Sequence, residues 1–327
     1  MNIKDIIKKN LPQSVVNKIQ LTLNDRMPFN QSIKKREDEV KKIYKKYIGE
    51  NLDLSNVKTF NEKIQWLKLY YDHEDLPKVV CKYNFKKYIK ENLGDGYTVP
   101  MYAVWDDVRK INFDNLPDKF VLKSNCSSAG NFIKIIEDKT KLDMHQLKEE
   151  LREWLNPRNL MINSYCRAYW KVKPYIIAEK YVEQIDGQAY DYKFFCFGGE
   201  PKFAYVATDH FPGEISKISV YDLDWNILDV KYGNHPQNNV KQPESLPAMI
   251  EIARKLSKKF PFVRVDFFEL DGKPVLSELT FYPGGGLNKI YPEKVDEEWG
   301  SYIDLPSKKN IYKPRRSILR TLKSIVR

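Results

Sequence analysis

The sequence has few residues that could build a disulfide framework or a thiolate metal site. Its four cysteines, Cys81, Cys126, Cys166 and Cys196, are far apart, and none belongs to a Cys-x-x-Cys pair. Its four histidines are also scattered, so a zinc site is not expected. These absences favour a reduced, cytoplasmic protein with free thiols.

Long apolar segments are missing as well. No apolar run reaches the roughly 18 residues that a membrane-spanning helix requires. The first residues, MNIKDIIKKN, lack the apolar core of a signal peptide. With 42% hydrophobic residues, the composition is nevertheless that of a folded globular chain, and 327 residues leave room for more than one compact unit.

Acidic residues are absent from the last segment. Residues 307–327 hold eight Lys or Arg and no acid, against a net charge of +11 for the whole chain. The rest is nearly balanced, so nucleic-acid binding is not expected. In the tail, Ile318, Leu319, Leu322 and Ile325 recur at helical spacing. This pattern predicts either a helix lying on an anionic membrane or a helix packed on the protein's own body.

Apolar periodicities predict an α+β protein with mainly antiparallel sheets. Residues 1–48 read as mostly helical and basic, and "FNEKIQWLKLYY" reads as a helix with Asn61 as its N-cap. Further helices are expected at 77–94, 142–155 and 245–260. Strands are expected at 119–125, 131–136, 174–183, 191–199 and 201–209.

The stretch "RVDFFELDGKPVLSELTFYPGGG", residues 264–286, predicts two strands around an Asp-Gly turn. A two-residue turn would place Asp266 opposite Ser277 and would send Glu278 to the other face of the sheet. A loop of three or five residues instead pairs Asp266 with Glu278. Pro274 favours the longer loop, because proline cannot donate a ladder hydrogen bond.

In the second register, Asp266, Glu278 and Arg264 share one face. Two carboxylates that close repel each other, and a divalent cation relieves the repulsion. The glycines that follow permit close approach of a ligand. The alternative is an ordinary solvated strand face.

Two upstream stretches could hold a nucleotide. Lys123 ends a predicted strand, and the small polar loop "SNCSSAGN" after it could bind phosphate oxygens through backbone N–H groups and hydroxyls. No GK[ST] occurs, so this is not a P-loop, and a plain hairpin loop is the alternative. In "IIAEKYVEQIDG", a strand edge could contact adenine and the later acid could bind ribose. The alternative there is a strand that leaves the core.

Together these stretches resemble a known family. The chain is similar to ATP-grasp proteins of the TupA-like branch, named for a teichuronopeptide-biosynthesis protein, over roughly residues 55 to 306. The resemblance is carried by "FNEKIQWLKLYY", "PDKFVLKSN", "IIAEKYVE", "DYKFFCFGGEPKF", "YDLDWN" and "FPFVRVDFFELDGKPVLSELTFYPGGG". It implies an ATP-grasp fold, with two α+β subdomains that clasp the nucleotide and a helical N-terminal region.

The resemblance also implies roles for individual residues. The ATP-binding set would be Lys82, Lys123, Ser127, Ser128, Glu179, Lys180, Val182 and Asp186. In that set Lys123 would contact the α- and β-phosphates under a mobile loop centred on the two serines, and Asp186 would take the ribose. The Mg²⁺ ligands would be Asp266, Glu278 and Thr280. Arg264 and Lys193 would be catalytic, with Arg264 at the reacting carboxyl phosphate.

Three positions depart from the family pattern. Thr280 stands where many ATP-grasp enzymes have Asn, and its hydroxyl is a poorer metal ligand. The helix that usually begins Asp-Lys begins Cys81-Lys82. The loop "SNCSSAGN" has fewer glycines than is typical of this branch, which would stiffen the lid.

The chemistry implied is ATP- and Mg²⁺-dependent ligation of a carboxylate to an amine, with an acyl-phosphate intermediate and ADP as product. The resemblance places it in cell-surface polysaccharide biosynthesis, acting on a uronic-acid-containing glycan or precursor and an amino acid or amine. The expected partners are a nucleotide and a small-molecule or glycan substrate. Residues 307–327 would add peripheral contact with the inner face of the membrane.

Two other enzyme classes stay open at this point. Asp222 and Asp224 have the Asp-x-Asp spacing of a glycosyltransferase metal site, although we interpret "YDLDWN" as a turn. A sugar kinase could use the same ATP site. The expected division of the chain is a basic helical region at 1–50, a helical or mixed part at 51–115, an ATP-grasp lid subdomain at 116–185, a C-terminal subdomain with the metal hairpin at 186–306, and a basic tail at 307–327.

Overall fold

A computed structural model describes residues 31–125, 132–156, 165–170, 172–185, 190–208, 217–233, 235 and 237–308. Three predicted site residues, Ser127, Ser128 and Asp186, lie outside these ranges. The same holds for the predictions made for residues 1–30 and for nearly all of the basic tail.

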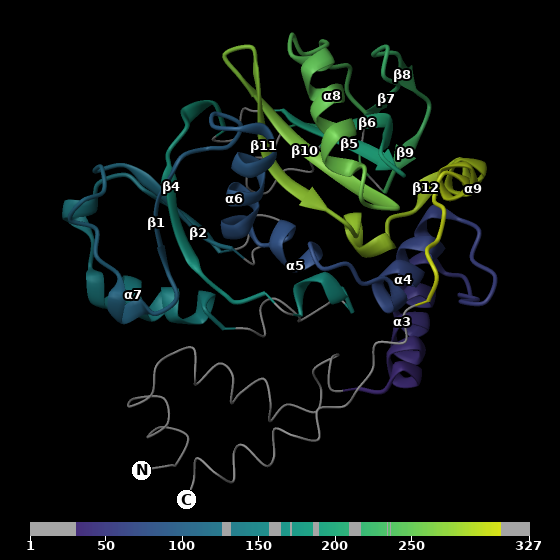
Figure 1. Ribbon diagram of the computed structural model, residues 1–327, viewed down its shortest axis with the longest axis horizontal. Helices are drawn as coiled ribbons and strands as arrows, with labels where there is room; N and C mark the ends of the chain where they lie inside the picture. Colours follow the sequence, from purple (N-terminus) through teal and green to yellow (C-terminus); the bar gives the residue numbers. More distant parts are fainter. Residues whose placement is uncertain are drawn as a thin grey trace, which may run out of the picture.

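The smaller of the two main sheets has the strand order β1-β4-β2-β3, and every neighbouring pair is antiparallel (Figure 1). Its strands are β1 (Met101–Trp105), β2 (Phe120–Ser124), β3 (Ile133–Ile136) and β4 (Ile176–Lys180). Helix α7 (Met144–Trp154) begins after Asp143, whose side chain accepts two N–H bonds of the first turn. Its buried Leu147 and Leu151 join Phe120 and Leu122 in one core.

The larger sheet has the order β11-β10-β5-β6-β7-β8 and is antiparallel along all its main pairs. Its strands are β5 (Asp191–Phe197), β6 (Glu200–Thr208), β7 (Lys217–Tyr221), β8 (Ile227–Leu228), β10 (Phe262–Leu270) and β11 (Lys273–Thr280). A separate pair is formed by β9 (Lys231–Tyr232) and β12 (Ile290–Tyr291). The predicted α+β class with mainly antiparallel sheets is confirmed.

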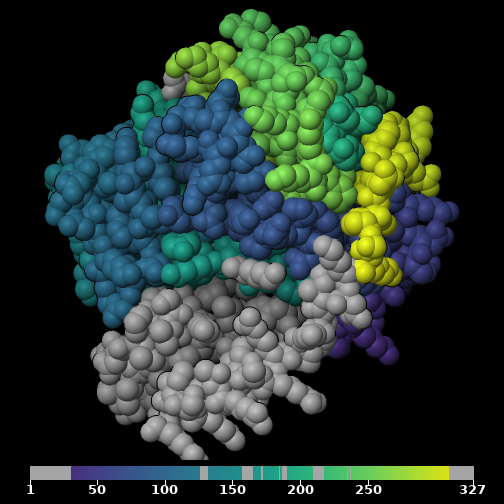
Figure 2. Space-filling view, in the orientation of Figure 1, coloured from purple at the N-terminus to yellow at the C-terminus, as the bar shows by residue number. Residues whose placement is uncertain are grey.

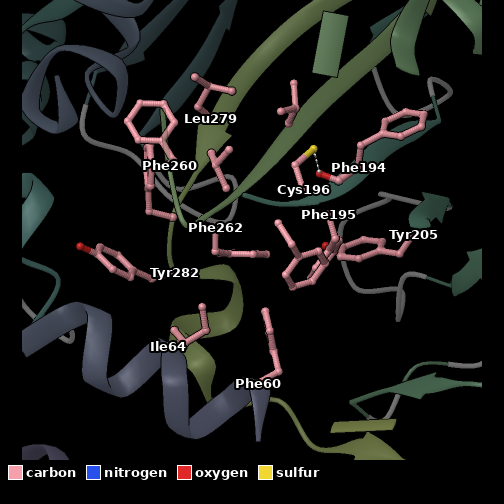
Figure 3. Close-up of a cluster of buried hydrophobic side chains, with 14 of the residues drawn as sticks. Phe60, Ile64, Phe194, Phe195, Cys196, Tyr205, Phe260, Phe262, Leu279 and Tyr282 are labelled. Atoms are coloured by element: carbon pink, nitrogen blue, oxygen red, sulfur yellow. Dashed lines mark hydrogen bonds between the residues drawn. The ribbon is translucent and has the colours of Figure 1, made fainter. Parts of the chain in front are cut away.

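Helices cover both faces of the larger sheet. Helix α8 (Leu246–Ser257) packs on β10, β5 and β6 (Figure 1). On the other face, Phe60 of helix α4 (Phe60–Tyr70) meets Phe262 edge-on, with ring centroids 5.0 Å apart. Trp299 of helix α9 (Glu293–Ser301) stacks on Phe203 at 4.0 Å. Figure 3 shows Phe60 and Ile64 beneath the aromatic side chains of the sheet. This aromatic core fixes α4 relative to β10.

Three further α-helices lie in the described part: α3 (Ile33–Ile48), α5 (Leu76–Val79) and α6 (Lys82–Leu93). Helix α6 contacts β11 of the larger sheet and forms an ion pair with β4 of the smaller one. It therefore lies between the two sheets (Figure 1) and covers their junction on the face seen in Figure 2.

Two helix predictions need correction. The N-cap of α4 is Thr59, which forms a capping box with Glu62, whereas Asn61 lies inside the helix. Asn61 is buried and donates to the carbonyl of Asn288 and to Asp296. The single helix expected at 77–94 is two helices, α5 and α6, that are separated at Val80 and Cys81.

No described helix has the length and apolar character needed to cross a membrane. The side chains of Cys81, Cys166 and Cys196 are buried.

Candidate active site

The turn of the β10–β11 hairpin is the two-residue Asp271-Gly272 turn. Both residues have positive φ, 52° and 69°, which is the conformation of a type I′ turn. Leu270 consequently lies opposite Lys273, so the longer loop that we favoured is wrong. Pro274 is tolerated because β11 is an edge strand, where a missing N–H costs no ladder bond when it faces outward.

The carboxylates nevertheless meet. Phe267 lies opposite Leu276, but the next pair is Asp266 with Glu278. Ser277 is the extra residue of a β-bulge, which shifts the register by one. The bulge supplies the pairing that we had attributed to a longer loop.

One nitrogen of the Arg264 guanidinium contacts side-chain oxygens of three other hairpin residues. Its Nη2 lies 2.5 Å from Asp266 Oδ2, 3.2 Å from Thr280 Oγ1 and 3.4 Å from Glu278 Oε1. Its Nε donates to Asp266 Oδ1 at 2.7 Å, and Thr280 Oγ1 donates to Glu278 Oε1 at 2.9 Å. The structure thus brings together all four residues that the sequence predicted for this hairpin.

These residues fit a divalent cation. Carboxylate and hydroxyl oxygens are the hard ligands that Mg²⁺ prefers. The oxygens of Asp266, Glu278 and Thr280 already surround one positive charge, the guanidinium nitrogen of Arg264. Among the described residues no cluster of three or more Asp, Glu, His and Cys forms a metal site, so a hydroxyl or backbone ligand would have to supplement the two carboxylates.

A lysine extends the charged row onto β5. Lys193 lies opposite Asp266 in the sheet, and its Nζ is 3.5 Å from Asp266 Oδ2 and 2.8 Å from Asp191 Oδ2. Burial lowers the pKa of Lys193, but the two aspartates outweigh it and raise that pKa above its usual value. The lysine therefore stays protonated beside the carboxylates.

The two carboxylates of the hairpin differ electrostatically. Asp266 is fully buried, and burial raises its pKa to about 6 although Arg264 and Lys193 oppose the shift. Burial also acts on Glu278, but Lys82, Arg264 and Lys193 prevail and lower its pKa to about 2. The Glu278 side chain is 40% exposed, so it is the carboxylate that solutes reach.

Helix α6 brings lysines to both sheets. Lys82, in its first turn, has its Nζ 3.6 Å from Glu278 Oε2. One turn later, Lys86 pairs with Glu179 of β4 at 2.9 Å. Lys123 of β2 reaches the other oxygen of Glu179, also at 2.9 Å. Burial would raise the pKa of Glu179, but the two lysines more than offset it and lower that pKa.

The residues expected near adenine lie at the end of β4 and just beyond it. The carboxylate of Glu179 is engaged by lysines, whereas Lys180 is exposed and its backbone N–H donates to the carbonyl of Pro100 at 2.9 Å. Val182 accepts from the N–H of Ile185 and opens the short 3₁₀ turn η6 (Glu183–Ile185). Glu179 and Lys180 belong to the strand pair β2–β4 that also carries Lys123, and Val182 lies two residues beyond the end of β4.

Sequence reasoning missed a buried polar pair on α4. Gln65 donates from Nε2 to the carbonyls of Gly285 and Gly286, at 2.9 and 2.6 Å. Lys68 donates from Nζ to Gly285 O at 2.7 Å and to Gln65 Oε1 at 2.6 Å. Both side chains are buried, and they hold the glycine turn η7 (Pro283–Gly286) that follows β11. The sequence did show Lys68 among the apolar residues of this helix, but it did not show that the partner of Lys68 is the carbonyl of Gly285.

Comparison with protein families matches residues 62–304 to the TupA-like ATPgrasp model. This chain belongs to the TupA-like ATP-grasp family. The predicted ATP-grasp fold is thereby confirmed. In this protein the fold consists of the two antiparallel sheets, with α6 between them.

Solved structures similar to this TupA-like protein include D-alanine–D-alanine ligase from Bacillus anthracis in complex with ATP, with 17% identity and a TM-score of 0.39 over 62% of this chain and 55% of that one. D-Alanine–D-alanine ligase from Helicobacter pylori has 13% identity and a TM-score of 0.40, over 75% of this chain and 69% of that one. The chain thus spans about half the length of the first of these ligases. Comparison with curated protein sequences finds no match.

The Asp-x-Asp sequence of this TupA-like protein lies in a turn between β7 and β8, as we interpreted it. Asp222 Oδ1 accepts from the N–H groups of Asp224 and Asn226, and its Oδ2 accepts from the Asn226 side chain at 2.9 Å. Both oxygens of Asp222 are thus used to close the turn, which disfavours the glycosyltransferase interpretation.

Proposed function

We propose that this protein is an ATP- and Mg²⁺-dependent carboxylate–amine ligase. The observation that carries the proposal is the convergence of Asp266, Glu278 and Thr280 on a single cationic nitrogen, beside Lys193 and next to Lys82 of α6. Oxygen ligands and fixed ammonium groups together are what transfer of a phosphoryl group requires, because its transition state spreads negative charge over several oxygens.

In the proposed reaction, a substrate carboxylate oxygen attacks the γ-phosphorus of ATP and the bond to the β-phosphate oxygen breaks, which releases ADP. An amine nitrogen then attacks the acyl carbon, and inorganic phosphate leaves as the amide forms and the amine loses a proton. Lys123, Lys82 and Lys193 would hold the phosphates, and Arg264 would face the carboxyl phosphate. Mg²⁺ on Asp266 and Glu278 would supply charge compensation at the phosphate oxygens.

The remaining nucleotide contacts belong to the same proposal. Glu179, Lys180 and Val182 would line adenine, Asp186 would bind ribose, and Ser127 and Ser128 would cover the phosphates. We assign the reaction to cell-surface polysaccharide synthesis on the cytoplasmic side of the membrane, with a uronic-acid-bearing glycan or precursor as carboxylate and an amino acid or amine as acceptor.

The test is a screen of the pure protein with ATP, Mg²⁺, uronic acids and amino acids. A ligase releases ADP and inorganic phosphate in equal amounts, and only when both substrates are present. A sugar kinase releases ADP without phosphate, and a glycosyltransferase consumes a nucleotide sugar, so either result would replace the ligase assignment.

Variants test the residues within that assay. Asp266→Asn and Glu278→Gln are each expected to abolish ADP formation, and near-normal activity of either at low Mg²⁺ would refute the metal assignment. Lys123→Ala is expected to weaken ATP binding about ten- to a hundredfold, because a charge-assisted contact is lost. Asp222→Ala is the control, since the hydrogen bonds of its carboxylate to other described residues lie within the turn.

A further inference from the structure

The carboxylate of Glu179 is held by two lysines at once. Lys86 Nζ lies 2.9 Å from Oε1 and Lys123 Nζ lies 2.9 Å from Oε2, so each oxygen has its own ammonium partner. The Glu179 side chain is only 6% exposed. A buried carboxylate of this kind needs a counter-charge, since breaking a buried pair costs several kilocalories per mole in general. One lysine is sufficient for neutrality, so the second is in excess.

The two lysines are anchored differently. Lys86 is the less exposed, at 14% against 24% for Lys123, and its Nζ also donates to the carbonyl of Val99. Within the part of the chain that the structure describes, Lys123 Nζ has Glu179 as its one polar partner. Lys123 is therefore the lysine that can leave Glu179, while Lys86 is fixed by two acceptors.

The backbone around Lys86 is also fixed. Helix α6 begins after Cys81, whose Sγ accepts from Asn125 Nδ2 at 3.1 Å. Asn125 follows β2 directly and is bonded to the backbone of Tyr175, so the start of α6 is tied to the end of the strand that carries Lys123. These bonds connect the helix that carries Lys86 to the strands that carry Lys123 and Glu179.

We propose that Lys86 is a positioning residue that neutralises Glu179 and so frees Lys123 to bind the phosphates of the nucleotide. The inference rests on the proposed ATP site and adds to it a residue that neither the sequence nor the family resemblance singled out. Without Lys86, Glu179 would keep Lys123 as its single counter-ion. ATP would then compete with a buried carboxylate for that lysine, and would approach an uncompensated negative charge.

A double-mutant cycle on the full chain tests this, with Mg-ATP affinity measured by calorimetry. The four proteins are the wild type, Lys86→Met, Glu179→Gln and the double variant. Lys86→Met is expected to lower the affinity about tenfold or more, since a charged hydrogen bond is lost at Lys123. The double variant is expected to bind ATP as tightly as Glu179→Gln, because no carboxylate charge is left to neutralise.

A matched control is available on the same helix. Lys87→Met removes a neighbouring ammonium that is 80% exposed and pairs with Glu91, and its affinity should equal that of the wild type. Such a result would exclude a general loss of positive field around α6 as the cause.

Three outcomes overturn the inference. Unchanged affinity in Lys86→Met would show that Glu179 does not compete for Lys123. An equal loss in Lys86→Met and in the double variant, relative to their parents, would make Lys86 a direct phosphate ligand or a packing residue. If Lys86→Met does not fold, the double variant is compared with Glu179→Gln alone, and a weaker affinity of the double variant overturns the inference, because no carboxylate charge is left for Lys86 to neutralise. Absence of ATP binding by the wild type would instead refute the proposed nucleotide site, and the inference with it.

Discussion

Replacement of Gly286 by alanine tests whether the glycine turn after β11 depends on close contact with α4. Gly286 has φ +64°, a conformation that costs an L-residue about 1–2 kcal/mol. An added Cβ would also lie 2.6 Å from Gln65 Nε2 and 2.7 Å from Ile64 Cγ2, both on a buried helix. Overpacking of this kind typically costs about 1–3 kcal/mol. We therefore expect Gly286→Ala to lower the free energy of unfolding by about 2–5 kcal/mol.

Gly198→Ala is the matched control for the backbone contribution. Gly198 has φ +56°, and a Cβ there would meet no heavy atom within 4 Å. Its replacement should cost only the conformational part, about 1–2 kcal/mol. Both variants would be unfolded in urea and followed by tryptophan fluorescence and by circular dichroism, with agreement between the two probes as the check on a single transition. Equal losses in the two variants would refute the argument that α4 is in tight contact with the turn.

Three further predictions concern other parts of the molecule. Gln65→Leu should destabilise the protein by about 1–3 kcal/mol, because the carbonyl of Gly286 loses its side-chain donor while that of Gly285 keeps Lys68, and a melting temperature equal to that of the wild type would contradict the buried network. Because the pKa of Glu179 is lowered on folding, its contribution to stability is present above the ordinary value of 4.5 and is lost as the pH falls through the folded pKa. Glu179→Gln should therefore flatten the acid limb of a stability–pH curve, and an unchanged limb would argue against the ion pairs. Deletion of residues 307–327 should abolish salt-sensitive binding to anionic vesicles, whereas a fall in melting temperature with no effect on vesicle binding would favour a tail packed on the protein.

Local patterns were sufficient to predict most of the elements. The run that became α8 was predicted at 245–260 and is observed as Leu246–Ser257, because its apolar spacing and its proline near the start both favour a helix there. Strands β5 and β6 followed from runs of apolar and aromatic residues. The start of α4 was predicted wrongly, because two residues compete as its N-cap. Thr59 prevailed over Asn61 because only Thr59 has a glutamate three residues later to complete a capping box.

Contacts between distant segments were beyond the reach of local patterns. Lys68 and Gly285 are 217 residues apart, and nothing in either stretch identifies the other. The same is true of Lys86, which reads as one of several lysines on a helix until β4 brings Glu179 against it. Family resemblance supplied Lys82, Lys123 and the hairpin residues because they lie in recognisable motifs. The resemblance did not identify residues outside the motifs, such as Lys86 and Lys68, that contact the motif residues or the turn after them.

The hairpin shows why a register can be ambiguous even when the functional pairing is guessed correctly. From the turn, Asp266 lies four residues before Leu270, while Glu278 lies five residues after Lys273. Side chains alternate along a strand, so an odd residue must be absorbed somewhere if both carboxylates are to share one face. A longer loop and a β-bulge can each accommodate the extra residue, and the lengths of the two strands do not distinguish between them. Asp271 and Gly272 decide the matter, because an Asp-Gly pair strongly favours the two-residue turn with positive φ at both positions. The odd residue is then Ser277, next to Glu278 itself, and the bulge places the exposed carboxylate beside the buried one.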